Sequence, residues 1–217
     1  MRSRRAEMTR GFFIALEGGE GAGKSTQARR LAETLRAGGR EVVQTREPGG
    51  SPGAEDIRKL LVTGDAARWT PLTEALLMYA AREDHLNATI RPALARGAVV
   101  ISDRFADSSE AYQGAGGGVP LETLNALRTA VVGADEPDLT LIFDLPVETG
   151  LARAAARGGD ARFESKGADY HQRLRDAFLA IAARRKDTAV LIDAAQSEDA
   201  VAEAIRMRVA DAMARPR

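Results

Sequence analysis

The chain has 217 residues, its 31 basic and 31 acidic side chains cancel at pH 7, and 44% of its residues are hydrophobic. This balance gives no overall attraction to nucleic acid or to an anionic membrane, and the hydrophobic content excludes a disordered chain. The sequence has no cysteine, which excludes disulfides and cysteine nucleophiles, and its two histidines, His85 and His171, argue against a histidine-rich metal centre.

The first ten residues contain four arginines and no apolar stretch, which predicts a disordered lead-in rather than a secretory signal. Either Met1 or Met8 could be the natural start. No apolar run approaches the roughly 18 residues of a membrane span. We therefore expect a cytoplasmic protein with no membrane or nucleic-acid partner.

From residue 11 onward, apolar runs alternate with helical patterns. Residues 12–16 form an apolar run that stops at glycines, which is typical of a buried strand, and residues 24–36 repeat apolar side chains as an amphipathic helix does. Further strands are predicted over 41–45, 98–102, 139–143 and 189–192, and further helices over 54–62, 70–95, 105–113, 121–132, 147–156, 168–185 and 198–214. This alternation predicts a single α/β domain over 11–217, with a five-stranded parallel sheet and helices on both faces. Ligands of such sheets bind at the carboxyl ends of the strands.

Residues 18–25 read GGEGAGKS, the phosphate-binding pattern G-x-x-x-x-G-K-[ST], between a predicted strand and a predicted helix. Glycines let backbone N–H groups converge on phosphate oxygens, and the helix N-terminus adds positive charge. Lys24 should reach the β- and γ-phosphates and Ser25 should ligate Mg²⁺. The alternative is a glycine-rich turn without a ligand, but the added lysine and serine favour a P-loop NTPase fold. The predicted ATP-binding residues are Gly18, Gly19, Glu20, Gly21, Ala22, Gly23, Lys24, Ser25 and Thr26.

A phosphate-binding loop alone does not distinguish switches, motors and kinases. The sequence has no N-K-x-D guanine motif, which argues against a switch GTPase, and it is short for a motor ATPase. A small phosphotransferase fits best.

Three further motifs follow the loop in chain order: TREPGG at 45–50, DRF at 103–105 and SSEAYQG at 108–114. With these motifs the chain resembles bacterial-type thymidylate kinases over about residues 11–214. The resemblance implies that ATP phosphorylates dTMP to give ADP and dTDP for dTTP synthesis, with Mg²⁺ as cofactor. It also implies a homodimer.

For the acceptor phosphate, the resemblance assigns Arg58 and Arg104 to grip dTMP, a role that suits the planar fork of arginine. It assigns Asp103 a catalytic role in organising Mg²⁺ and its waters. It places Glu47 near the acceptor sugar and the water shell of the metal.

For the base, the resemblance implies that Arg82 donates to a thymine carbonyl and that Ser109 and Gln113 read the rest of the pyrimidine edge. Tyr112 would lie under the deoxyribose and exclude a 2′-hydroxyl. At Met78 the sequence departs from the family, which usually has a phenylalanine stacking on thymine there. Methionine lacks that flat face, although its polarisable sulfur can still lie against a ring.

A lid is expected over about residues 151–167, where Arg153 and Arg157 share one helix face and two glycines precede Arg162. Phosphoryl transfer passes through a highly charged transition state, so a cation is needed beside Lys24. In the family that the chain resembles, this cation comes either from the loop or from the lid. Because this loop has Glu20 and no arginine before its lysine, the resemblance implies that the lid arginines supply it. Glu20 could hold one of them when the lid is closed.

Two alternatives remain open at this point. The chain could phosphorylate another (deoxy)nucleoside monophosphate or a deoxynucleoside, or it could be a regulatory ATP-dependent switch without an acceptor. The dTMP phosphate is already ionised at pH 7, so no general base is required, and neither histidine is assigned a role.

Overall fold

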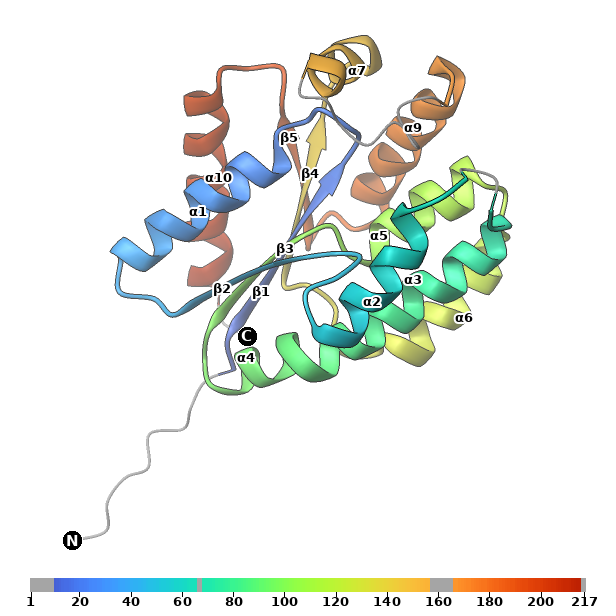
Figure 1. Ribbon diagram of the computed structural model, residues 1–217. Coiled ribbons are helices and arrows are strands. Elements are labelled where there is room, and N and C mark those ends of the chain that lie inside the picture. Colours follow the sequence, from blue (N-terminus) through green and yellow to red (C-terminus); the bar gives the residue numbers. More distant parts are fainter. Residues whose placement is uncertain (1–9, 66–67, 157–165, 216–217) are drawn as a thin grey trace, which may run out of the picture.

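The computed structural model describes residues 10–65, 68–156 and 166–215 (Figure 1). Of the predicted lead-in, only Arg10 falls within these ranges, and its guanidinium donates to the Asp138 carboxylate at 3.2 Å. No helix within the described ranges is long and apolar enough to cross a membrane.

The sheet has five parallel strands in the order β2-β3-β1-β4-β5, which confirms the predicted α/β fold. The registers align the carboxyl ends of the strands, since Asp103 pairs with both Leu16 and Arg46, and Asp144 pairs with Asp193. The strands are β1 (Phe12–Gly18), β2 (Val42–Arg46), β3 (Val99–Asp103), β4 (Leu139–Asp144) and β5 (Ala189–Asp193). Polar residues from four strands thus meet at one edge of the sheet.

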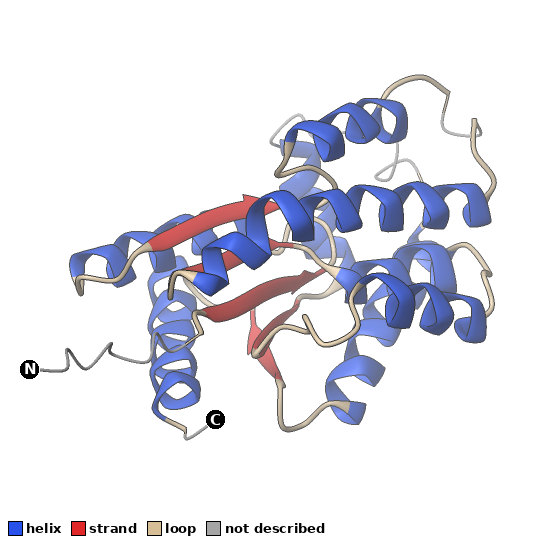
Figure 2. Ribbon diagram, turned by 90° about the horizontal axis from the view of Figure 1, so that it is seen from below, coloured by secondary structure: helices blue, strands red, loops and turns tan. Residues whose placement is uncertain are grey.

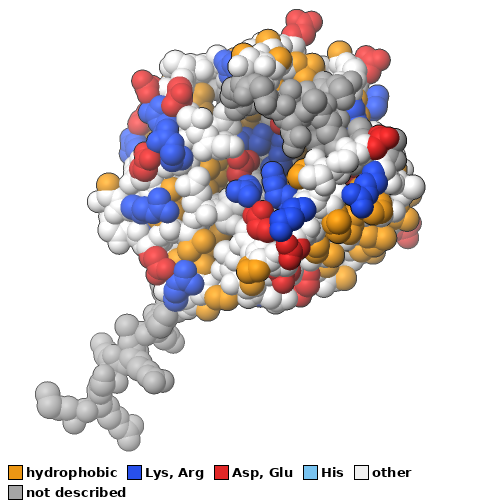
Figure 3. All heavy atoms as spheres, viewed as in Figure 1, with side chains coloured by type: hydrophobic (Ala, Val, Ile, Leu, Met, Phe, Trp, Pro, Cys, Tyr) orange, Lys and Arg blue, Asp and Glu red, His pale blue; other side chains and the backbone are white. Residues whose placement is uncertain are grey.

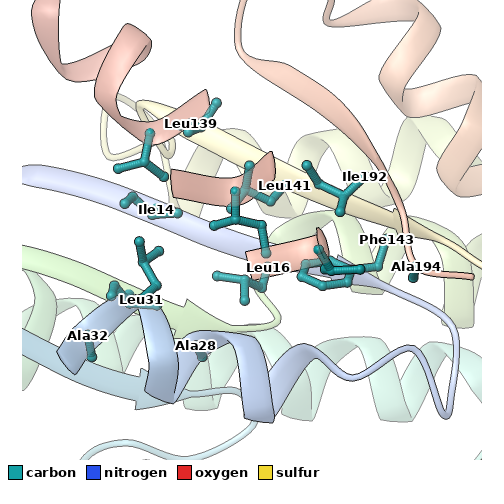
Figure 4. Close-up of a cluster of buried hydrophobic side chains, with 14 of the residues drawn as sticks. Ile14, Leu16, Ala28, Leu31, Ala32, Leu139, Leu141, Phe143, Ile192 and Ala194 are labelled. Carbon is teal, nitrogen blue, oxygen red and sulfur yellow. The ribbon is translucent and has the colours of Figure 1, made fainter. Parts of the chain in front are cut away.

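Helices cover both faces of the sheet, as the two views in Figures 1 and 2 show. Alternate residues of β1 point to opposite faces because side chains of a strand have a period of two. Ile14 and Leu16 pack toward α1 (Lys24–Ala37) and α10 (Glu198–Ala214), as Figure 4 shows in part, whereas Phe13 joins a second core against α3 and α4. Burying each such side chain contributes about 1.5–3 kcal/mol.

The other helices of the described residues contribute loops and side chains near the carboxyl ends of the strands or cover the sheet. They are α2 (Pro52–Val62), α3 (Pro71–His85), α4 (Arg91–Ala95), α5 (Ala106–Ser109), α6 (Leu121–Val131), α7 (Val147–Ala156) and α9 (Ala168–Arg184). Two of the predicted helices are wound differently in the structure.

The helix predicted over 70–95 widens into a π-helical turn, η1 (Leu86–Ile90), where the N–H of Arg91 bonds to the carbonyl of Leu86. Pro92 follows and has no N–H for the regular α-helical bond.

The helix predicted over 105–113 is also wound differently. It begins at Ala106 as α5 and continues as a π-helical segment, η2 (Glu110–Gly116), which ends among glycines. Turns of this kind occur often at functional sites.

A partly buried ion cluster connects α5, α6 and the end of α9. Asp107 of α5 accepts from Arg128 of α6 at 2.7 Å and from Arg185, just after α9, at 2.8 and 2.9 Å. Glu136 takes two further bonds from Arg128 at 2.5 Å. The carboxylate of Asp107 is buried and has two cationic partners, so the position of α5 depends on it.

Candidate active site

The glycine-rich loop joins the end of β1 to the start of α1, as the motif predicts. At Gly21 the backbone has φ +70°, and a Cβ there would lie 2.0 Å from the carbonyl oxygen of Gly150 in α7. A Cβ at Gly150 would in turn lie 2.6 Å from the carbonyl oxygen of Glu20. The loop and α7 therefore touch backbone to backbone, which only glycine allows.

Lys24 is buried beneath this loop. Its ammonium donates to the carbonyls of Gly18 at 3.0 Å and Gly19 at 2.6 Å, at the start of the loop. Burial first, and then the positive charge of Arg104, lower the pKa of Lys24 to about 8, against the opposing effect of Glu20 and Asp103.

Ser25 and Asp103 lie together beside Lys24, and the Ser25 hydroxyl donates to Oδ2 of Asp103. A hydroxyl and a carboxylate are hard oxygen donors, and Mg²⁺ commonly takes one or two protein ligands while phosphates and waters complete its shell. No group of three or more His, Cys, Asp or Glu that could hold a metal ion occurs in the described parts of the chain. The pair therefore fits a magnesium ion that is shared with a phosphate ligand.

Arg104 follows β3 and adopts a left-handed backbone conformation with φ +73°, which is rare for a residue other than glycine. Its guanidinium donates to Oε1 of Glu20 at 2.8 Å and to the Gly18 carbonyl at 3.1 Å. It also lies over the Tyr112 ring, 4.8 Å from the centroid. This backbone conformation thus turns the side chain back toward the phosphate-binding loop.

Glu20 was expected to hold a lid arginine when the lid is closed, and two of those arginines, Arg157 and Arg162, lie outside the described residues. The Glu20 carboxylate accepts from Arg104 and from the Tyr112 hydroxyl, the latter at 2.7 Å. Burial alone would raise the pKa of Glu20, but Arg104, Lys24 and the Tyr112 hydroxyl lower it to about 2. Glu20 is therefore an anion between two cations, and it lines the cavity described below.

A second buried carboxylate fixes the segment that carries Arg104. Glu17, at the end of β1, accepts from the Phe105 N–H at 2.8 Å and from the Ser108 hydroxyl at 2.6 Å. Burial first, and then the nearby negative charge of Asp107, raise the pKa of Glu17 to about 7. Glu17 was not among the predicted site residues, although an acid within an apolar strand is itself a signal of a buried polar contact.

At the other end of the site, Arg82 and Glu47 form a buried ion pair. Nε of Arg82 donates to Oε2 of Glu47 at 2.7 Å, and the side chains are 2% and 5% exposed. The other guanidinium nitrogens donate to the Ser109 hydroxyl at 3.2 Å and to the Phe105 carbonyl at 3.1 Å. Arg82 is thereby held with its plane fixed, at the boundary of the cavity described next.

A cavity of about 280 Å³ joins these groups, at the carboxyl edge of the sheet. Figure 3 shows basic and acidic side chains gathered around a hollow on this face of the molecule. Both predicted metal ligands, Ser25 and Asp103, lie on its wall. So does every residue predicted to contact the acceptor nucleotide: Glu47, Arg58, Met78, Arg82, Arg104, Ser109, Tyr112 and Gln113. The wall also includes Val62, Phe105 and Ser108, which were not predicted.

Two residues of the cavity wall, Arg58 and Met78, come from the helices α2 and α3. Nη1 of Arg58 donates to the Pro48 carbonyl at 2.6 Å, so α2 presents this guanidinium next to the loop that carries Glu47. Met78 is half-buried and lies one helical turn before Arg82 on α3.

Of the predicted lid arginines, only Arg153 lies in the described part of the chain. It sits on α7 and donates to the Ala194 carbonyl at 3.0 Å, next to the loop after β5. Arg157 and Arg162 lie outside the described residues.

Comparison with known proteins shows which family this chain is similar to. The family model described as thymidylate kinase matches residues 16–205. The thymidylate kinase of Caulobacter vibrioides is 64% identical over 198 residues, which cover 91% of this chain and 95% of the relative. A thymidylate kinase of Pseudomonas fluorescens is 58% identical over 86% of this chain and 89% of the relative.

A solved structure is also similar. The crystal structure of thymidylate kinase from Ehrlichia chaffeensis has a TM-score of 0.76 and 31% sequence identity to this chain, and it covers 92% of this chain and 99% of its own length.

Proposed function

The chain belongs to the thymidylate kinase family, and because it therefore transfers a phosphoryl group from ATP to dTMP, giving ADP and dTDP, we propose that the cavity beside Lys24 is the dTMP site. The observation that carries this proposal is that Arg58 and Arg104, and with them Arg82 and Ser109, line one and the same cavity. The first pair suits a phosphate, and the second pair suits the carbonyl edge of a pyrimidine.

We assign the ATP phosphates to the loop of residues 18–26 and the acceptor phosphate to Arg58 and Arg104. Ser25 and Asp103 would hold Mg²⁺, which when bound neutralises charge on the phosphate oxygens. Lys24 and Arg153 would then add positive charge as the phosphoryl group passes between its donor and acceptor oxygens, with Arg157 and Arg162 proposed for the same role. Catalysis of this kind depends on alignment, to which a half-buried Arg104 with several fixed contacts would contribute.

Within the cavity, Gln113 and Ser109 are proposed to complete recognition of the base, and Tyr112 to lie under the sugar. The Tyr112 ring is already held in place, because its hydroxyl donates to Glu20 and Arg104 covers one face. A fixed ring can exclude a 2′-hydroxyl by its bulk, whereas a mobile ring could give way.

The substitution Met78→Phe tests the placement of the base. A flat ring at this position should stack on thymine and lower the KM for dTMP about two- to tenfold. Initial rates of ADP formation from MgATP with dTMP, dUMP, dCMP, dGMP and AMP would measure both affinity and preference. Met207→Phe is the matched control, because Met207 is exposed on α10. An unchanged KM for dTMP in Met78→Phe would place the base elsewhere.

The pH dependence of ATP use should report Lys24. Its pKa of about 8 means that the free enzyme loses this proton as the pH rises through that value. The KM for MgATP should therefore rise above pH 8, while kcat stays flat because bound phosphates favour the charged lysine. Initial rates at saturating dTMP between about pH 6 and pH 10 would show this. Lys24→Arg should retain its charge and lack the rise, and the same rise in that variant would contradict the assignment.

We also propose that the enzyme is a homodimer that uses α3 and α6. Leu72 and Leu76 lie one turn apart on α3, Leu121 begins α6, and their exposures are 46%, 51% and 46%. Figure 3 shows hydrophobic side chains gathered on this side of the molecule. Large apolar surfaces of this kind favour burial against a partner. Sedimentation of Leu76→Asp, which places a charge in the patch, should give a smaller particle than the unchanged chain.

A further inference from the structure

His85, which sequence reasoning left without a role, is fully buried at the end of α3 and both of its ring nitrogens have partners. Nδ1 lies 3.0 Å from Oε1 of Glu47, and Nε2 lies 2.7 Å from the hydroxyl of Thr45 on β2. An ionised carboxylate can only accept, so Nδ1 carries the proton in this contact. The hydroxyl of Thr45 holds the opposite side of the ring.

Glu47 is divided between two partners. Oε1 takes the bond from His85 and Oε2 takes the bond from Nε of Arg82 at 2.7 Å. Arg82 in turn donates to the Ser109 hydroxyl. A continuous chain of hydrogen bonds thus runs from β2, through His85 and Glu47, to the wall of the cavity.

The loop after β2 closes over the imidazole. At Gly50 the backbone has φ +87°, and a Cβ there would lie 2.5 Å from Nε2 of His85 and 2.3 Å from the Thr45 hydroxyl oxygen. The backbone of Gly50 therefore packs directly on this pair. The hydroxyl of Thr89, four residues after His85, also donates to the Gly50 carbonyl at 2.7 Å. The ring has no room to turn, and a buried group fixed on several sides can orient its neighbour.

We propose that His85 is a positioning residue for dTMP recognition, whose Nδ1–H holds the Glu47 carboxylate so that Arg82 is aimed at the pyrimidine. The inference rests on the proposed dTMP site. His85 does not touch the cavity, so it acts through Glu47. An arginine whose plane is set by a fixed carboxylate loses less conformational entropy when it binds a ligand. This smaller entropy loss should strengthen the binding of dTMP and leave the binding of ATP unchanged.

Two isosteric substitutions separate this role from packing. The amide nitrogen of Asn can take the place of Nδ1, whereas that of Gln takes the place of Nε2. His85→Asn should keep the KM for dTMP within about threefold of the unchanged enzyme, and His85→Gln should raise it about tenfold or more. The KM for MgATP and kcat should stay within about threefold in both variants. Equal effects of the two variants, or equal effects on both substrates, would overturn the proposal.

Glu47→Gln distinguishes the inference from the function on which it rests. In the Glu47→Gln background, His85→Gln should add nothing further to the KM for dTMP, because the two residues act as one unit. If Glu47→Gln alone leaves dTMP affinity unchanged, the proposed dTMP site is wrong. If Glu47→Gln weakens dTMP binding but its effect and that of His85→Gln simply add, the positioning role is wrong. Should either His85 variant fail to fold, Thr45→Val against Thr45→Ser replaces the pair. Valine should raise the KM for dTMP and serine should not, and equal values would refute the proposal.

Discussion

Arg104→Lys is expected to lower kcat/KM for dTMP by about 100- to 1000-fold, the largest effect on activity that we anticipate. Lysine keeps the positive charge but lacks the planar fork, so it cannot bond the Gly18 carbonyl and Glu20 at once and still reach a phosphate. Both residues meet the same backbone cost at φ +73°, so the substitution isolates the chemistry of the head group. Steady-state rates with varied dTMP at saturating MgATP measure the effect.

Arg91→Lys is the matched control for Arg104→Lys. Arg91 also forms an ion pair, with Asp135 at 2.7 Å, but it lies at the start of α4 and does not line the cavity. Its kcat/KM should stay near that of the unchanged enzyme. A loss in Arg104→Lys no larger than that of the control would show that Arg104 does not bind the acceptor phosphate.

Asp107→Ala should have the largest effect on stability. It removes the shared carboxylate of Arg128 and Arg185 and leaves Glu136, which is itself 35% exposed, as the anionic partner of two guanidinium groups that are about four-fifths buried. Breaking a buried pair in this way costs about 3–5 kcal/mol. For a chain of this size the melting temperature should fall by about 6–20 °C, as calorimetry would show. Because α5 follows Arg104, we also expect weaker dTMP binding at temperatures at which the variant is still folded.

Asp56→Ala serves as the reference for Asp107→Ala. Asp56 pairs with Lys59 at 2.7 Å, but both side chains are more than 70% exposed. Exposed pairs of this kind contribute about 0–1 kcal/mol. Similar melting temperatures in the two variants would mean that the Asp107 cluster does not hold α5.

The fold was largely readable from the sequence, because its strands are continuous apolar runs and its first loop is a motif with a physical reason for each residue. The widening of the helix at Leu86–Ile90 was not predicted, although Pro92 was a visible signal of it. Pattern methods register a proline as a break, whereas here the helix continues with one wider turn. The order of the strands was also not predicted, because periodicity carries no information about which strands pair.

The residues of the candidate site could be predicted from the sequence, whereas several of their contacts could not. The resemblance to thymidylate kinases was enough to select Arg58, Arg104 and Met78, which the structure brings to one cavity. The contacts of Glu20 and His85 were not foreseen, because their partners lie far away in the sequence and a single residue type does not reveal its distance to another. His85 lies three residues after Arg82, on the same side of α3, and this spacing was the one available hint.

The contact between Gly21 and Gly150 limits how this enzyme can be re-engineered. A replacement loop from another nucleotide kinase would bring its own phosphate-binding backbone but not the bare stretch of α7 against which this one rests. A host protein with any side chain at the position of Gly150 would clash with the backbone of the transferred loop. The sequence motif of the loop does not include this position. The transplantable unit is therefore the loop together with the first turns of α7, two segments that lie far apart along the chain.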